Sequence, residues 1–230
     1  MVQFCKPEHG KHLRREVRTQ MKHLRALLFA AMAVVVAYGQ NDTPYQVKYA
    51  SNLNIGDSVI NVTNTGANGA GLGSGTSASV TGAICVNVYA FDPREEIVSC
   101  CSCPVTPNGL VSLSAQRDLI SNPLFPFVPT SIVIKLVATA PVGGSCSGSA
   151  LLAGTPVLVN GMLAWGTTLH ANTSAAPGTY AVTETRFSNA TLSAGEQARL
   201  AYSCGIVANQ GSGFGVCNSC RLGGLGSVRE

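Results

Sequence analysis

The segment Ser131–Thr139 (SIVIKLVAT) is a nearly continuous apolar run rich in β-branched residues, and it predicts a central, well-buried strand. The chain around it contains further short β-branched runs separated by Gly, Pro and Asn, which favours strands over helices. These candidate strands are Tyr45–Ala50, Ser58–Asn64, Ala83–Phe91, Glu96–Cys100, Leu110–Ser114, Pro156–Asn160, Met162–Thr168 and Thr179–Phe187. Asn160-Gly161 predicts a tight hairpin, because both central turn residues need positive φ. Asp92–Glu95 predicts a second hairpin.

One helix is predicted near the C-terminus. Ser193 and Glu196 have the spacing of a capping box, with Ser193 as the N-cap and Glu196 at the third helical position. Apolar residues then recur at helical spacing, at Leu200, Cys204, Val207 and Ala208. Gly211 supplies a stop signal, so the helix is placed at Ala194–Asn209. The predicted fold class is mainly β: a disulfide-stabilised, β-sandwich-like domain with one C-terminal helix at about 194–209.

The first 39 residues have the organisation of a secretory signal peptide. Residues 1–25 contain seven basic and two acidic residues, and an uncharged apolar run of 12 residues, Ala26–Ala37, follows. Small residues at Ala37 and Gly39 are typical of a cleavage site, and Met21 offers an alternative translation start. The apolar run is shorter than the roughly 20 residues of a membrane-spanning helix, although an uncleaved anchor is the alternative.

The predicted mature chain, residues 40–230, is a single mostly-β domain with a Gly-rich C-terminal tail. Its expected location is secreted, extracellular or at the cell surface, with the periplasm as the alternative, and no membrane span remains after cleavage. Of the chain's net charge of +4, the leader contributes +5 (7 − 2), which leaves −1 for the mature domain. A near-neutral domain lacks the electrostatic attraction that nucleic-acid binding needs, so nucleic acid is excluded as a partner.

The mature chain contains eight cysteines: Cys85, Cys100, Cys101, Cys103, Cys146, Cys204, Cys217 and Cys220. An even number in an exported chain predicts up to four disulfides, and the 105 arrangements of eight cysteines leave their connectivity open. A bridge between the adjacent Cys100 and Cys101 would strain their peptide, so separate partners are expected. The alternative is a metal or redox site built from Cys100-x-x-Cys103 and Cys217-x-x-Cys220. Their separation exceeds that of compact zinc motifs, and the prediction includes no metal and no cofactor.

Other candidate chemistry is sparse. His170 is the single histidine of the mature chain, and no G-x-S-x-G nucleophile motif accompanies it, so no catalytic residue and no enzymatic activity are predicted. Trp165 and Tyr180 are the candidates for binding a glycan or peptide, since exposed aromatic rings can line such grooves.

Two segments, Ala83–Ser114 and Leu192–Arg229, carry a Cys-Cys-x-Cys cluster and a G-S-G-x-G-x-C-x-x-C tail. Through these motifs, which cover about a third of the chain, the sequence resembles a group of uncharacterised secreted, cysteine-containing bacterial proteins of the acidobacterial type. The resemblance implies export and bridged cysteines, and it implies no catalytic residues.

The predicted function is that of a non-enzymatic secreted or cell-surface structural protein, such as a self-associating filament or surface-layer subunit. Homo-oligomers would form by sheet-edge addition, with the N-terminal strand Tyr45–Ala50 adding to a neighbour's sheet. One alternative is a monomeric extracellular glycan- or peptide-binding module that uses Trp165. A second alternative is a metal or redox protein that uses the two C-x-x-C pairs.

Overall fold

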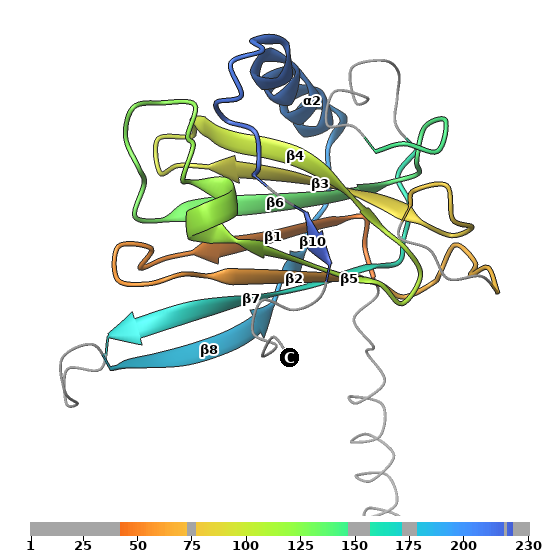
Figure 1. Ribbon diagram of the computed structural model, residues 1–230, viewed down its shortest axis with the longest axis horizontal. Coiled ribbons are helices and arrows are strands. Elements are labelled where there is room, and N and C mark those ends of the chain that lie inside the picture. The colour runs from red at the N-terminus through yellow and green to blue at the C-terminus, as the bar shows by residue number, and fades with distance from the viewer. Residues whose placement is uncertain (1–41, 73–76, 147–156, 172–178, 219, 223–230) are drawn as a thin grey trace, which may run out of the picture. The chain divides into compact units, whose positions relative to one another are not determined.

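The computed structural model describes residues 42–72, 77–146, 157–171, 179–218 and 220–222 (Figure 1). The predicted signal peptide, residues 1–39, lies outside the described residues. In the part of the chain that the structure describes, no helix has the length and apolar character to cross a membrane.

Two five-stranded antiparallel sheets pack face to face (Figure 1). The first has the order β4-β3-β6-β1-β9 and contains β1 (Tyr45–Ala50), β3 (Ile84–Phe91), β4 (Ile97–Val105), β6 (Ile132–Thr139) and β9 (Ser188–Asn189). The second has the order β10-β5-β2-β7-β8 and contains β2 (Val59–Asn64), β5 (Leu110–Ser114), β7 (Met162–Ala171), β8 (Tyr180–Arg186) and β10 (Arg221–Leu222). Together with one C-terminal helix and the disulfides described below, these sheets confirm the predicted mainly-β, sandwich-like class.

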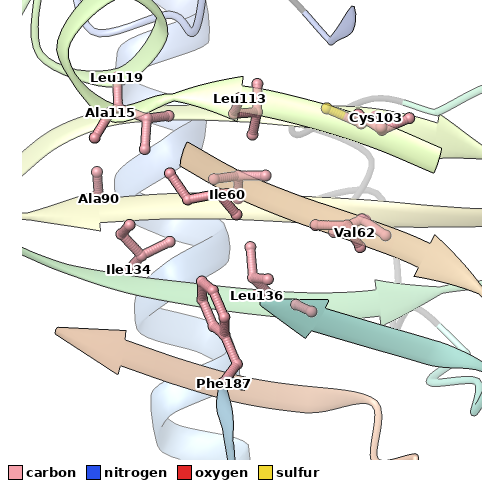
Figure 2. Close-up of a cluster of buried hydrophobic side chains, with 14 of the residues drawn as sticks. Ile60, Val62, Ala90, Cys103, Leu113, Ala115, Leu119, Ile134, Leu136 and Phe187 are labelled. Atoms are coloured by element: carbon pink, nitrogen blue, oxygen red, sulfur yellow. The ribbon is translucent and has the colours of Figure 1, made fainter. Parts of the chain in front are cut away.

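The apolar run that predicted a central strand forms β6, the middle strand of the first sheet. Ile134 and Leu136 of β6 point into the core between the sheets, where they meet Ile60 of β2, Leu113 of β5 and Phe187 (Figure 2). The opposite face of the first sheet is also covered, so that all eight residues of the neighbouring strand β3 are buried. Burial on both faces explains why β6 lacks a simple alternation of apolar and polar residues.

The cover on that opposite face is the helix α2 (Ala194–Asn209). Leu200 and Val207 of α2 pack with Tyr89 of β3 and Val137 of β6 in a second hydrophobic cluster. Lys135, the one charged residue of β6, also faces the helix, and its Nζ lies 2.5 Å from Oε1 of Glu196. The polar interruption of the apolar run therefore serves to pair the helix with the sheet.

The helix has the predicted boundaries. Ser193 is its N-cap, and the backbone N–H of Glu196 donates to Ser193 Oγ at 3.1 Å. The carboxylate of Glu196, which a capping box directs at the Ser193 backbone, pairs with Lys135 instead. Gly211, just beyond the helix, has φ of 63°, a left-handed conformation that ends helices.

The prediction of a hairpin at Asn160-Gly161 is wrong. Gly161 has φ of 106°, but Asn160 does not share the positive φ that a two-residue hairpin needs. Leu158 bridges to Thr139 at the end of β6 in the first sheet, whereas Met162 begins β7 in the second. The turn thus transfers the chain between sheets, and the predicted strand Pro156–Asn160 is reduced to this one bridge within the described residues.

The second predicted hairpin is confirmed and joins β3 to β4. Oδ1 of Asp92 accepts the backbone N–H groups of Arg94 and Glu96, and Glu95 has φ of 66°. The predicted second strand of this hairpin ends at Cys100, whereas β4 continues to Val105. Further elements without a sequence prediction are the two-residue strands β9 and β10 and a single π-helical turn, η1 (Ala115–Leu119).

Tyr89 gives a first prediction, on stability. Its ring is fully buried, its hydroxyl lacks a hydrogen-bond partner among the described residues, and burial raises its pKa far above the ordinary value. Unfolding frees this hydroxyl to ionise, so the stability that the neutral form provides is present below about pH 10 and is lost as the pH rises further. We expect Tyr89→Phe to raise the free energy of unfolding by about 1 kcal/mol at pH 7 and to weaken this alkaline loss.

Guanidinium unfolding at pH 7 and at pH 10.5, about half a unit above the ordinary tyrosine pKa, measures both effects. The matched control is Tyr202→Phe, because Tyr202 is 66% exposed and should change neither value. A Tyr89→Phe protein that is less stable than wild type would show that the buried hydroxyl does not destabilise the fold.

Candidate functional site

All eight cysteines of the described residues form disulfides, which confirms the predicted bonding. The bridges are Cys85–Cys146, Cys100–Cys204, Cys101–Cys217 and Cys103–Cys220. The adjacent Cys100 and Cys101 have separate partners, as expected from the strain of a vicinal bridge.

Strand β4 carries three of these bridges and uses both of its faces. Cys100 points to the cluster under α2, where it is bonded to Cys204. Cys101 and Cys103 are two residues apart, so they share the other face, which belongs to the core between the sheets. The grouping of Cys100 with Cys103 in one C-x-x-C site is therefore wrong, because the strand separates these two side chains.

Four sulfur atoms gather where the C-terminal segment runs beside β4. The Sγ atoms of Cys101, Cys103 and Cys220 all lie within 4.8 Å of one another, and Cys217 is bonded to Cys101. Cys103 is buried and the other three cysteines are half-buried. We call Cys101, Cys103, Cys217 and Cys220 the four-sulfur cluster.

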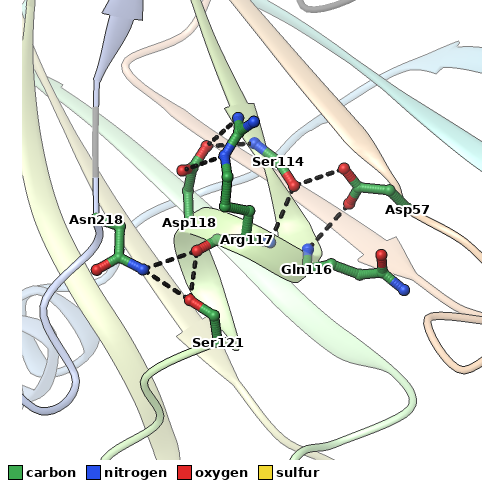
Figure 3. Close-up of polar contacts among 7 residues, drawn as sticks. All are labelled: Asp57, Ser114, Gln116, Arg117, Asp118, Ser121 and Asn218. Carbon is green, nitrogen blue, oxygen red and sulfur yellow. Dashed lines mark hydrogen bonds and ion pairs between the residues drawn. The ribbon is translucent and has the colours of Figure 1, made fainter.

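Hydrogen bonds also hold the C-terminal segment beside β4. The side-chain amide of Asn218 donates to the backbone oxygen of Arg117 at 2.8 Å and to Ser121 Oγ at 2.7 Å (Figure 3). The backbone N–H of Asn218 donates to the backbone oxygen of Asp118 at 3.1 Å. The backbone N–H of Cys217 donates to the backbone oxygen of Cys100 at 3.2 Å. The position of Cys217 is therefore fixed by contacts other than its disulfide.

The turn η1 that receives Asn218 is itself anchored in the second sheet. Ser114 caps it by accepting from the backbone N–H of Arg117, and Asp57 accepts from Ser114 Oγ and from the Gln116 backbone (Figure 3). Asp118 accepts from the Ser114 backbone N–H at 2.7 Å. The capping residue Ser114 directly before this turn was the available sequence signal, but one turn is too short for periodicity to reveal.

Apart from the four-sulfur cluster, the outer edge of β8 is a second candidate site. β8 is the last strand of its sheet. It pairs with β7 over seven residues in unbroken register, from Trp165↔Arg186 to Ala171↔Tyr180. All seven of its residues are exposed, including Tyr180 at 40% and Val182 at 60%. No other strand of the described residues pairs with it, so its outward backbone N–H and C=O groups form a regular, open edge.

Tyr45–Ala50, the strand predicted to add to a neighbour's sheet, occupies an interior position of its own sheet in this structure. These residues form β1, which pairs with β6 along its whole length and with β9 at Gln46 and Val47. β1 is thus an internal strand, whereas no strand of the described residues pairs with the outer edge of β8.

Trp165 and Tyr180, the predicted binding residues, are not brought together. Trp165 is half-buried opposite Arg186, whose guanidinium carbon lies 5.4 Å from its ring centroid, whereas Tyr180 is opposite Ala171. The two positions are six residues apart along β7, or about 20 Å at the rise of a strand. His170, at the surface, contacts Thr183 Oγ1 through Nε2 at 2.8 Å.

Comparison with protein-family models, with curated proteins and with solved structures finds no match to this chain.

Proposed function

We propose that this protein is a non-enzymatic, exported structural subunit that self-associates by pairing the open edge of β8 with the same edge of a second copy. The observation that carries the proposal is the length and regularity of that edge. Natural proteins normally block exposed edges with proline, lysine, bulges or very short strands, because open edges recruit other strands. The seven residues of β8 contain no proline, glycine or lysine and keep an unbroken register.

The four disulfides support the exported location. Disulfides persist in oxidising compartments and are rare in the cytosol. They would also maintain a subunit whose outer surfaces are used for contacts, since covalent bridges add stability without requiring more buried surface.

The side chains of β8 favour one antiparallel register between the two copies. A two-fold axis at Thr183 places Val182 opposite Glu184 and Tyr180 opposite Arg186 of the other copy. Thr–Thr pairs across strands are favourable, whereas like charges directly opposite each other are not. An axis at Thr183 pairs all seven residues of β8, whereas an axis at Glu184 would place two carboxylates face to face, so the Thr183 register is the one we propose.

A two-fold β8 pair closes on itself and therefore accounts for a dimer. Growth into a filament or layer needs a second surface. The outward side of α2 offers exposed apolar residues one turn apart, Tyr202 (66% exposed) and Ile206 (41%), beside a shallow pocket that also includes Gly205. In the proposed assembly, this side of α2 provides the contact between dimers.

The β8 contact is tested with Val182→Glu. In the Thr183 register this change places two carboxylates opposite each other at two symmetric positions, and we expect the dimer dissociation constant to rise about tenfold. Analytical ultracentrifugation of the mature protein over a concentration series measures this constant. Val128→Glu is the matched control, because Val128 is 62% exposed, like Val182, and lies outside β8.

Adding Glu184→Lys to Val182→Glu tests the register itself. The double variant places opposite charges at both positions and should restore the dissociation constant to near the original value. A strictly monomeric wild-type protein at high concentration would contradict the proposed function. Unchanged association of Val182→Glu would show that the copies meet elsewhere.

A further inference from the structure

We propose that the four-sulfur cluster is a redox-convertible metal site: two disulfides when oxidised, and a tetrathiolate site for a thiophilic divalent cation such as Zn²⁺ when reduced. This inference concerns a different surface from β8 and does not depend on self-association.

The sulfur positions match the size of such a site. Four thiolates at about 2.3 Å from a tetrahedral Zn²⁺ are about 3.8 Å from one another. The Sγ atoms of Cys101, Cys103 and Cys220 already lie within 4.8 Å of one another, and Cys217 is held next to Cys101. Three of the four sulfurs therefore already lie close to the spacing of such a site, and in the proposed site rotation of the Cys217 side chain brings the fourth sulfur onto the same ion.

The two cluster bridges are more accessible to a reductant than the Cys100–Cys204 bridge. Cys100 and Cys204 are each 2% exposed, whereas Cys101, Cys217 and Cys220 are half-buried. Because reduction requires access to a sulfur atom, mild treatment opens the two cluster bridges before Cys100–Cys204.

The reduced chain keeps the ligands in place. Cys100–Cys204 still joins β4 to α2, and hydrogen bonds still hold the segment from Gly215 to Asn218 against β4 and η1. The backbone N–H of Cys100 donates to the Gly215 oxygen at 2.8 Å on one side of Cys217, and Asn218 contacts η1 on the other. The positions of Cys101, Cys103 and Cys217 are thus organised before metal binds, which lowers the entropic cost of binding.

A phosphine can reduce the two disulfides of the four-sulfur cluster. Each disulfide reacts with one phosphine and one water to give two thiols and one phosphine oxide. Binding of Zn²⁺ then releases four protons from the four thiols and forms four Zn–S bonds, so affinity rises with pH.

The test uses Co²⁺ as a spectroscopic probe on the folded mature protein. Limited phosphine treatment without oxygen is followed by alkylation and mass spectrometry to identify the opened bridges. Parallel unalkylated samples are then titrated with Co²⁺. We expect the visible absorption of tetrahedral thiolate-bound Co²⁺, saturating at one ion per chain and lost when Zn²⁺ is added.

Three double variants locate the site. Cys103→Ser/Cys220→Ser and Cys101→Ser/Cys217→Ser each remove two ligands and should lose the tetrahedral absorption, while circular dichroism checks that they remain folded. Cys85→Ser/Cys146→Ser keeps all four ligands and should still bind one ion. The proposal is overturned if reduced wild-type protein with four alkylatable cluster thiols gives no such absorption, or if a folded ligand-removing variant gives the same absorption.

Discussion

Replacing Cys100 and Cys204 together by Ala should lower the free energy of unfolding by about 3 kcal/mol. The bridge spans 104 residues, but Cys101–Cys217 closes almost the same loop. The additional loop that Cys100–Cys204 closes is therefore only the chain from Cys204 to Cys217, and closure of roughly 15 residues corresponds to about 3 kcal/mol. Guanidinium unfolding under non-reducing conditions measures the difference.

The neighbouring bridges supply the control. Cys101–Cys217 and Cys103–Cys220 lie side by side, so removing one of them leaves the other to close almost the same long loop. We expect the Cys103→Ala/Cys220→Ala protein to lose less stability than the Cys100→Ala/Cys204→Ala protein. The reverse order would show that shared loop closure does not govern these bridges.

Much of the fold could be predicted from the sequence where local and tertiary requirements coincide. Ser131–Thr139 is apolar because the resulting strand is buried from both sides, and composition alone reveals this. The helix from Ala194 to Asn209 has a cap, an apolar face and a glycine stop, and each is encoded within a few residues. Its boundaries were therefore predicted correctly.

Errors arose where the outcome depends on the partner strand. Asn160-Gly161 has the local signature of a hairpin, but the preceding residues pair with β6, and the turn changes sheets instead. The same limit applies to Tyr45–Ala50, the strand predicted to add to a neighbour's sheet, since no local signal shows that β6 and β9 pair with it on both sides in its own sheet.

For the cysteines too, one property could be predicted from the sequence and another depended on the fold. Their number and the predicted export signal were enough to predict disulfides. Their grouping required knowing that residues 100–105 continue a strand, because a strand places Cys100 and Cys101 on opposite faces. A C-x-x-C pattern suggests a shared site only in a turn or helix, and β4 is neither.

Asn64 joins three parts of the sandwich at one end. It is fully buried at the end of β2, and its Nδ2 donates to the backbone oxygens of Gly82 and Val105, both at 2.9 Å. Its Oδ1 accepts the backbone N–H of Gly66 at 2.9 Å. These three hydrogen bonds require the side-chain amide of Asn64, whose Nδ2 is a donor and whose Oδ1 is an acceptor.

Asn64→Asp keeps the shape of this side chain and removes the donor, and we expect it to cost about 3–5 kcal/mol at pH 7, as for other buried charges that lack a partner. The introduced carboxylate would face the carbonyl oxygens of Gly82 and Val105, so burial and repulsion would raise its pKa in the folded protein. The neutral acid can donate one hydrogen bond, so its contribution to stability is fully present below about pH 4 and is lost as the pH rises through the raised pKa. The stability deficit relative to wild type should therefore shrink as the pH falls from 7 to 4 in urea unfolding experiments.

Asn54→Asp is the control, since Asn54 is exposed and its replacement should cause neither the loss of stability nor the pH dependence. A deficit that stays constant with pH would mean that the lost amide donor alone, and not the buried charge, causes the destabilisation.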